Sequence, residues 1–359
     1  MQRKLDVLHL ARSLHQRFVA LGAHAVEADV LQDAALLLDL YGEDIRARAY
    51  TVHDPARGEM MMRPDFTVPV TQMHMAHGAN PARYTYLGDV FRRQEEYPER
   101  RNEYVQVGYE IFGQEDPAAA DADVFVAMQS ALGEAALKVS TGDMRIIAAA
   151  VAGLGTSEAR QAALMRHLWR PRKFRALIER FAQVKPLDPA RAEASRQQVQ
   201  AQDVIGKRSA TEINMRLEAL AQDAQTAPLS KEQVALMDML LGIRETSHYA
   251  LEQLRDLAID MPALEPALDH MERRLEALSQ RGVDVHRLPF EASYGRTSME
   301  YYDGFVFGFY ADARPGLPPV ATGGRYDALT ARLGEGACLP AVGAVIRPDL
   351  LLEISGESQ

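Results

Sequence analysis

Two stretches of the chain set polar side chains at alternating positions among strand-forming residues. In "MRPDFTVPV", Arg63, Asp65 and Thr67 alternate along what we expect to be an extended segment, so the three side chains should share one face. An acid and a hydroxyl placed side by side could hold an ammonium group. A hydrated strand face would show the same spacing, so this pattern alone leaves both interpretations open.

The second stretch is "DVFRRQEEYPERRNEYVQVGYEIFG", in which two strand-like segments flank a charged loop. Gln106, Gly108 and Glu110 alternate along the second strand, so the glutamine and glutamate point the same way. Such a pair projecting from a sheet can hold an amine or an imidazole, and Arg92 on the neighbouring strand could neutralise a carboxylate or a phosphate. An antiparallel hairpin with one hydrated face is the alternative.

Two tyrosine-bearing stretches follow near the C-terminus. In "YGRTSMEYYDGFVFGF", Tyr301 and Tyr302 lie side by side, and one could face a pocket while the other packs in the core. In "ATGGRYDALTARLG", two glycines permit close approach of the backbone to a ligand, and Tyr326 lies where we expect a helix to open. Core tyrosines and an ordinary turn would explain the same residues. Neither stretch matches the glycine motif of a phosphate loop or of a dinucleotide fold.

The elements that must position these residues are strands interrupted by helices. We expect helices near the N-terminus, then strands from about 47 to 113 with one helix at 67–77, and a strand at 143–151. Helical spacing dominates 155–259, and strand character returns after one further helix. The pattern predicts an α+β fold whose core, 1–154 and 260–359, is split by a helical insertion, 155–259. Short turns between consecutive strands favour an antiparallel sheet.

Composition excludes several classes of function. The 359 residues carry a net charge of −10, which disfavours general nucleic-acid binding. A single cysteine, Cys338, rules out an internal disulfide and a cysteine zinc cage. No signal peptide or apolar run of about 18 residues is present, so we expect a cytoplasmic protein that does not enter a membrane. No pattern indicates a metal or cofactor.

Taken in order, the blocks "RPDFT", "FRRQ…QVGYEIFG", "YYDGFVF", "GGRYDAL" and "PAVGAVI" resemble the catalytic core of the histidyl-tRNA synthetases, which are class II synthetases. The resemblance covers about 10–150 and about 265–350. It implies a six- to seven-stranded antiparallel sheet with flanking helices, a homodimer formed through the first helix and strand, and a pocket for histidine.

The resemblance also implies roles for individual residues. Asp65, Thr67 and Gln106 would hold the α-amino group of histidine. Glu110 and one of Tyr301 or Tyr302 would contact the imidazole. The remaining residue, Tyr326, would lie in a loop, 323–327, that closes over the ligand.

The ATP half of the synthetase pattern is not kept. Arg92 is present, but Gln94 stands where the family has an acid. The arginine of the third motif is replaced by Leu350; Arg347 comes three residues early, and we expect Pro348 to disturb the helix that would present it.

The segment before the tyrosine pair also departs from the synthetases. Thr297 and Ser298 stand where the family has its catalytic arginine, and Arg296 is one position further away. Gly308 replaces an acid. Arg92 and Arg296 are therefore expected to be, at most, contacts for a carboxylate or for a vestigial phosphate site.

A synthetase-like chain that keeps its histidine half is similar to the ATP phosphoribosyltransferase regulatory subunits. That resemblance implies a short catalytic partner subunit, a hetero-octamer with four chains of each kind, and L-histidine as a feedback effector. Synthetases continue into an anticodon-binding domain, whereas this chain ends at Gln359, so we expect no tRNA binding of that kind. A free-standing histidine-activating enzyme and another synthetase-like accessory protein are the alternatives.

Overall fold

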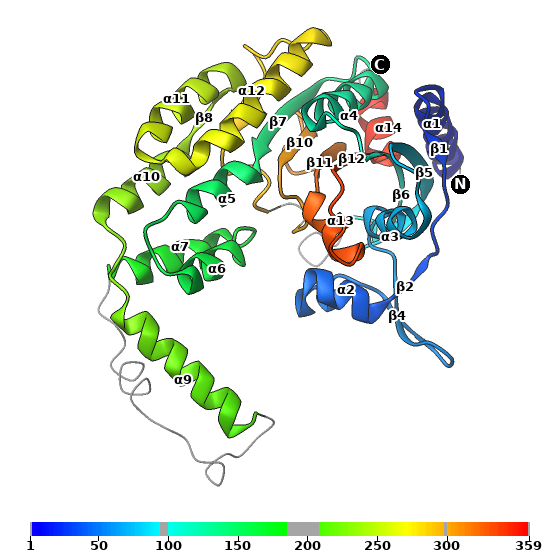
Figure 1. Ribbon diagram of the computed structural model, residues 1–359. Coiled ribbons are helices and arrows are strands. Elements are labelled where there is room, and N and C mark those ends of the chain that lie inside the picture. The colour runs from blue at the N-terminus through cyan, green and yellow to red at the C-terminus, as the bar shows by residue number, and fades with distance from the viewer. Residues whose placement is uncertain (1, 94–99, 185–207, 298–299, 358–359) are drawn as a thin grey trace.

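The computed structural model describes residues 2–93, 100–184, 208–297 and 300–357, and its core is one large sheet (Figure 1). This sheet has nine strands in the order β1-β5-β6-β12-β11-β10-β7-β9-β8. Its members are β1 (His24–Ala25), β5 (Ala82–Phe91), β6 (Glu103–Phe112), β7 (Leu137–Asp143), β8 (Arg244–Thr246), β9 (Pro289–Glu291), β10 (Phe305–Ala311), β11 (Ala321–Arg325) and β12 (Ala341–Ile346).

The middle of the sheet is antiparallel, as the sequence predicts. Each neighbouring pair from β5 through β7 runs antiparallel. The sheet is nevertheless larger than the expected six or seven strands and is not wholly antiparallel, because β1 joins β5 and β9 joins β7 in parallel. These additions are short: β1 pairs through two residues and β9 through one, so they extend the edges without changing the centre. A separate three-stranded sheet contains β2 (Leu31–Asp33), β3 (Thr51–Asp54) and β4 (Gly58–Met62).

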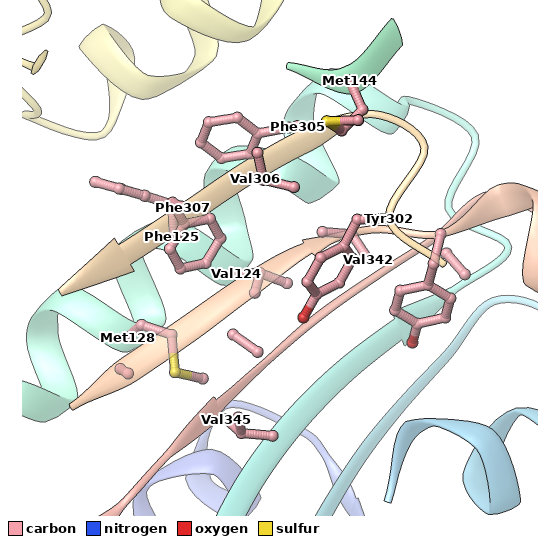
Figure 2. Close-up of a cluster of buried hydrophobic side chains, with 14 of the residues drawn as sticks. Val124, Phe125, Met128, Met144, Tyr302, Phe305, Val306, Phe307, Val342 and Val345 are labelled. Carbon is pink, nitrogen blue, oxygen red and sulfur yellow. The ribbon is translucent and has the colours of Figure 1, made fainter. Parts of the chain in front are cut away.

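Helices cover one face of the large sheet and build the main core there. The helices α1 (Gln2–Ala20) and α4 (Pro117–Leu132) pack on β6 and β12, and α12 (Glu265–Gln280) packs on α4. Figure 2 shows Phe125 of α4 beside Phe307 of β10, and their ring centroids are 5.2 Å apart. Phe305 and Phe309, which alternate with apolar and glycine positions on β10, also contact Phe125. These helices leave the opposite face of the sheet uncovered by the main helical core.

That opposite face is bordered by shorter elements. The N-terminal end of α3 (Thr67–His77) reaches it, and α13 (Asp327–Leu333) packs on α3 and β12. The helix α2 (Ala34–Tyr41) and the 3₁₀ helix η1 (Glu43–Ala47) lie beside the small sheet. The helix α14 (Pro348–Glu357) follows β12 and contacts α1 and β6.

The segment 155–259 is mostly helical among its described residues. It contains α6 (Glu158–Met165), α7 (Pro171–Phe181), α9 (Ala210–Gln225), α10 (Lys231–Gly242), β8 and α11 (Ser247–Asp260); α9 buries no residue and extends away from the other elements (Figure 1). Although the segment carries hardly any strand signal, β8 pairs with β9 at the edge of the large sheet. A 3₁₀ turn, η3 (Pro262–Leu264), leads from α11 to α12. No helix among the described ranges is long and apolar enough to cross a membrane.

The strand expected at 143–151 is wrong. This stretch forms the helix α5 (Met144–Ala152), and the side chain of Asp143 caps it by accepting a hydrogen bond from the backbone N–H of Arg145. A short apolar run can suit a strand or a buried helix. Here Ile146, Ile147 and Ala150 are fully buried at helical spacing, and the alanines favour the helix.

Candidate functional site

The centre of the site is the carboxylate of Glu110, on the face of β6 opposite the helical core. Three hydroxyls donate hydrogen bonds to it: Tyr326 at 2.6 Å, Tyr86 at 2.8 Å and Thr67 at 3.2 Å. A β-carbon at Gly343 on the neighbouring strand would lie only 1.3 Å from Glu110 Oε2, so a glycine is required there. The donors come from α3, β5 and the start of α13, and together they fix the carboxylate.

The environment of Glu110 alters its protonation. Burial raises the pKa of Glu110 from its ordinary value of 4.5 to about 7, and the negative charge of Asp65 adds to the rise. Hydrogen bonds from Tyr326, Tyr86 and Thr67 lower the same pKa, because they stabilise the charged form. A carboxylate has about four acceptor positions, and three hydroxyls leave capacity for one further donor. An N–H of a ligand could use it.

A second buried carboxylate, Asp65, lies between β4 and α3. It accepts a hydrogen bond of 2.7 Å from Tyr41, and the Arg92 guanidinium is 3.7 Å from its Oδ2 atom. Arg92 also donates from Nε to the carbonyl of Pro64 at 2.6 Å. The Oδ1 atom of Asp65 accepts weakly, at 3.4 Å, from the backbone N–H of Val68 in the first turn of α3. Asp65 thus holds the turn and presents a charged acceptor.

The expectation that 63–67 is extended is wrong. The strand β4 ends at Met62 and α3 begins at Thr67 after the N-cap residue Phe66, whose backbone is already helical. Arg63 binds the backbone carbonyls of Asp89, at 2.8 Å, and of Ala28, and its guanidinium lies 4.0 Å from the centre of the Phe66 ring. Asp65 and Thr67 therefore reach the site through a turn, while Arg63 joins the residues after β4 to β5 and to the segment between β1 and β2.

Gln106 is on the same face of β6 as Glu110, as the two-residue spacing predicts. Its side chain is 1% exposed, and its Oε1 atom has no hydrogen-bond partner among the described residues. Between the two lies Gly108, where a β-carbon would come within 2.0 Å of the Tyr86 ring. Buried polar atoms are usually paired, so an orphaned acceptor in this position suits a donor brought by a ligand.

Both tyrosines of the pair are buried near the two carboxylates. The Tyr301 ring lies 6.0 Å from Tyr41 and 6.0 Å from Tyr326, and Tyr302 is 5.0 Å away. Burial raises the pKa of Tyr301, and the charge of Asp65 raises it further. The pKa of Tyr302 is raised by burial and then by Glu110. The hydroxyls of both residues are thus held neutral beside the two carboxylates.

Tyr326 is not in a mobile closing loop. It is fully buried as the residue before α13, and the preceding residues 321–325 form β11, which pairs with β10 on one side and β12 on the other. A strand with both edges paired inside a sheet cannot open without breaking that sheet. The loop expected over 323–327 is therefore wrong, and Tyr326 acts by donating to Glu110.

A small cavity lies beside Asp65, and Glu110 is not among the described residues that line it. Its volume is about 40 Å³, and its lining includes Tyr41, Pro64, Arg92 and Glu300. Small-molecule sites usually measure about 300–1,000 Å³. An amino acid would therefore enter only after side chains around Asp65 rearrange.

Comparison with known proteins gives the family. The family described as Histidyl-tRNA synthetase matches 3–222 and 214–351 of this chain. The ATP phosphoribosyltransferase regulatory subunits of Agrobacterium fabrum and Brucella ovis are each 30% identical to it, over 99% and 94% of both sequences. The chain belongs to the ATP phosphoribosyltransferase regulatory subunit family. The family name places this regulatory-subunit chain in histidine biosynthesis.

Solved structures share the fold of this regulatory-subunit chain. A Bacillus halodurans protein described as an ATP phosphoribosyltransferase regulatory subunit/histidyl-tRNA synthetase has a TM-score of 0.70 at 22% identity, covering 98% of this chain and 79% of the other. A histidine–tRNA ligase subunit from Alicyclobacillus acidocaldarius has a TM-score of 0.58 at 23% identity, covering 98% and 94%. The predicted class II synthetase-like α+β fold is confirmed.

Arg296 and Pro348, both considered from sequence, have other roles in this fold than expected. Arg296 donates from Nε to the carbonyl of Leu168 at 2.9 Å and stacks 4.6 Å from the centre of the Phe174 ring, so it binds the α6–α7 region instead of lining the cavity beside Asp65. Pro348 is the first residue of α14, where a proline lacks no required hydrogen bond. The expected disturbance of that helix is therefore wrong. Gln94 and Ser298 lie outside the described residues.

Sequence reasoning missed three residues of the candidate site. Tyr86 pairs in register with Gly108, and an aromatic residue facing a glycine across two strands was a signal that could have found it. Gly343 pairs with Glu110 in the same way. Tyr41 ends α2, and no spacing along the chain connects it to Asp65.

Proposed function

We propose that this chain is a non-catalytic regulatory subunit that a short ATP phosphoribosyltransferase catalytic subunit requires for the first step of histidine biosynthesis. In this proposal L-histidine binds beside Asp65 and Glu110 and produces feedback inhibition. The chain itself does not aminoacylate. The observation that carries the proposal is the burial of three acceptors, Asp65, Gln106 and Glu110, on one side of the sheet.

The chemistry of each acceptor suits one part of histidine. The carboxylate of Asp65, with Thr67 and the orphaned Oε1 of Gln106, would hold the ammonium group. Glu110 would accept from an imidazole N–H, and Arg92 would face the ligand carboxylate. In this proposal Tyr301, Tyr302 and Tyr326 also contact histidine through their hydroxyls. When histidine binds, some hydrogen bonds between tyrosines and carboxylates would be replaced by hydrogen bonds to the ligand. The present conformation, in which those internal bonds are made, is therefore closed. Arg296 was expected to be, at most, a contact for a carboxylate or a vestigial phosphate site, and its bond to Leu168 argues against that role.

The site has direct contacts to the helical segment that could carry a conformational signal. The indole N–H of Trp169 donates to the backbone carbonyl of Tyr302 at 3.3 Å. Arg296, near the tyrosine pair, holds Leu168 and Phe174. If histidine moves Tyr302, the α6–α7 region must respond. Allosteric couplings are typically about 1–3 kcal/mol, which is enough for strong inhibition without a shared active site.

The assembly we propose is a hetero-octamer in the cytoplasm, with four regulatory and four catalytic chains and no bound tRNA. It contains a regulatory dimer formed through the first helix and strand. Leu5, Val19 and Leu21 expose 53%, 43% and 51% of their surface in this region, and Val30 exposes 39%. These exposed apolar side chains on and after the first helix support a contact between two copies. Mass measurement by light scattering, with and without the catalytic subunit, tests the stoichiometry.

A reconstitution assay tests the function. The short phosphoribosyltransferase of the same organism is assayed for phosphoribosyl-ATP formation with and without this chain, each with and without histidine. We expect activity only with the chain present, and inhibition by histidine. An Asp65→Asn, Glu110→Gln double variant should support activity but lose inhibition. Full activity of the catalytic subunit alone would refute the proposal.

Histidine binding can be followed separately, because Trp169 is the single tryptophan of the chain. Its contact with Tyr302 should make its fluorescence respond to histidine. Calorimetry of the same titration is the second readout, and Trp169→Phe is the control for the optical signal. Histidine-dependent exchange between ATP and pyrophosphate would instead support a histidine-activating enzyme. Tyr294 argues against that alternative, since its hydroxyl fills the space beside Gly308, where synthetases have an acid.

A further inference from the structure

The connection between α6 and α7 concentrates positive charge in a chain that is acidic as a whole. Five of the ten residues 166–175 are arginine or lysine, a sixth is His167, and none is acidic. The net charge of the whole chain is −10. Charge of one sign on a protein of the opposite sign gives that surface a potential of its own, which attracts acidic partners.

Three of these cations are available to a partner. Arg166, Arg172 and Lys173 are exposed, and none of them forms an ion pair within the described parts of the chain. Arg175, by contrast, pairs with Glu179 at 3.1 Å and also with Asp238. The three cations without a partner form the basic patch.

The pKa of His167 shows how closely the cations gather. Burial lowers this pKa, and the charges of Arg170, Lys173 and Arg166 lower it further. The patch also surrounds the N-terminal end of α7, where the N-cap residue Arg170 makes no side-chain cap among the described residues. The positive end of the helix dipole therefore adds to the potential of the patch.

The two aromatic side chains of the same stretch are engaged inside the protein. The indole of Trp169 donates to the backbone carbonyl of Tyr302, and Phe174 is 1% exposed beneath the guanidinium of Arg296. Surfaces that bind single-stranded nucleic acid combine cations with exposed aromatic side chains on which the bases stack. This surface offers cations without such a platform, which favours the carboxylates of a protein as the partner groups.

The basic patch is joined to the pocket proposed for histidine. Besides the indole hydrogen bond, Arg170 lies 3.8 Å from the carboxylate of Glu300, which lines the small cavity beside Asp65. Arg296, which precedes the tyrosine pair, donates to the carbonyl of Leu168 at 2.9 Å. A molecule held at the patch would therefore bias the same segment that histidine moves, and each would change the affinity of the other.

We propose that the basic patch is the surface on which the catalytic subunit docks, through an acidic segment of that subunit. The inference rests on the proposed function, because it takes the short phosphoribosyltransferase as the partner. Carboxylates of this segment would pair with Arg166, Arg172 and Lys173 and would compete with Glu300 for Arg170. Figure 1 shows α6 and α7 on the side of the molecule away from α1, so a dimer formed through α1 would leave the patch open.

The test measures binding of the full chain to the short catalytic subunit of the same organism, by biolayer interferometry at low and high salt. The patch variant is the triple change Arg166→Gln, Arg172→Gln and Lys173→Gln. It should weaken binding by about tenfold or more, chiefly through slower association, because exposed charges steer the encounter of two proteins. Added salt should weaken binding of the parent much more than binding of this variant.

A matched control removes the same number and kind of exposed cations elsewhere: Lys138→Gln, Arg273→Gln and Arg287→Gln. This control should keep the parent affinity, and urea unfolding confirms that both triple variants are folded. A single exposed change, Arg172→Glu, is a second variant and should weaken binding more than Arg172→Gln does.

The outcomes separate this inference from the function on which it rests. If the parent chain activates the catalytic subunit and the patch variant binds it equally well, the docking surface lies elsewhere and the inference is overturned alone. If the parent chain neither binds nor activates the catalytic subunit, the proposed function fails as well. Fluorescence anisotropy with a labelled RNA duplex is the third arm. RNA that binds the parent but not the patch variant, while the catalytic subunit binds both equally, would assign the patch to nucleic acid instead.

Discussion

Replacement of Glu110 by glutamine should remove a pH dependence from the stability of this protein. The folded-state pKa of Glu110 is raised by burial from 4.5 to about 7. Below 4.5 the group is protonated in both folded and unfolded chains. As the pH rises toward 7, the unfolded chain loses this proton while the folded chain keeps it, so stability falls. Above about 7 both states are ionised and the loss is complete.

The size of this effect follows from the shift. One pKa unit corresponds to about 1.4 kcal/mol, so the rise from 4.5 to about 7 predicts a loss of about 3 kcal/mol across that pH range. Glutamine keeps the shape of the side chain but does not titrate. The free energy of unfolding of Glu110→Gln, minus that of the parent protein, should therefore become more positive by about 3 kcal/mol as the pH rises through this window.

Urea unfolding at a series of pH values, followed by circular dichroism, measures both free energies. The control is Glu103→Gln, which changes an exposed glutamate on the same strand and should leave the pH profile of the parent unchanged. Parallel profiles for the parent and Glu110→Gln would refute the reasoning, since they would show that burial does not raise this pKa. A difference with the opposite sign would show that the three hydroxyl donors outweigh burial.

Three further predictions concern single residues. Asp65→Asn should weaken histidine binding by about 1.5–3 kcal/mol, the value of a hydrogen bond to a charged group, as measured by calorimetry. Gly343→Ala should displace the Glu110 carboxylate and lower the thermal unfolding midpoint, because a β-carbon there would lie 1.3 Å from Oε2; an unchanged midpoint would contradict this. Arg325→Met should cost about 3–5 kcal/mol in urea unfolding, because it leaves Asp121 buried without the guanidinium that is 2.7 Å away. A loss below 1 kcal/mol (about the value of an exposed pair) would show that other groups replace it.

The sequence alone was sufficient for features that repeat along one element. The two-residue alternation of Gln106 and Glu110 determines that both point from the same face of a strand, and the structure has them there. The order of five motif blocks indicated the class II fold before any contact was known. The local sequence pattern was insufficient where a strand and a helix would show the same pattern. At 143–151, for example, an apolar run forms the helix α5.

Tertiary structure alone decided which residues from different elements meet. Tyr41 reaches Asp65 from α2, and Tyr86 reaches Glu110 from β5, because strand register and the packing of α2 bring their hydroxyls there. Arg296 donates a hydrogen bond to the carbonyl of Leu168, whereas Arg347, which follows β12, lines a cavity of about 770 Å³. Spacing along a chain reports the direction of a side chain within its own element. The partner of that side chain depends on contacts between elements, which many distant residues determine together.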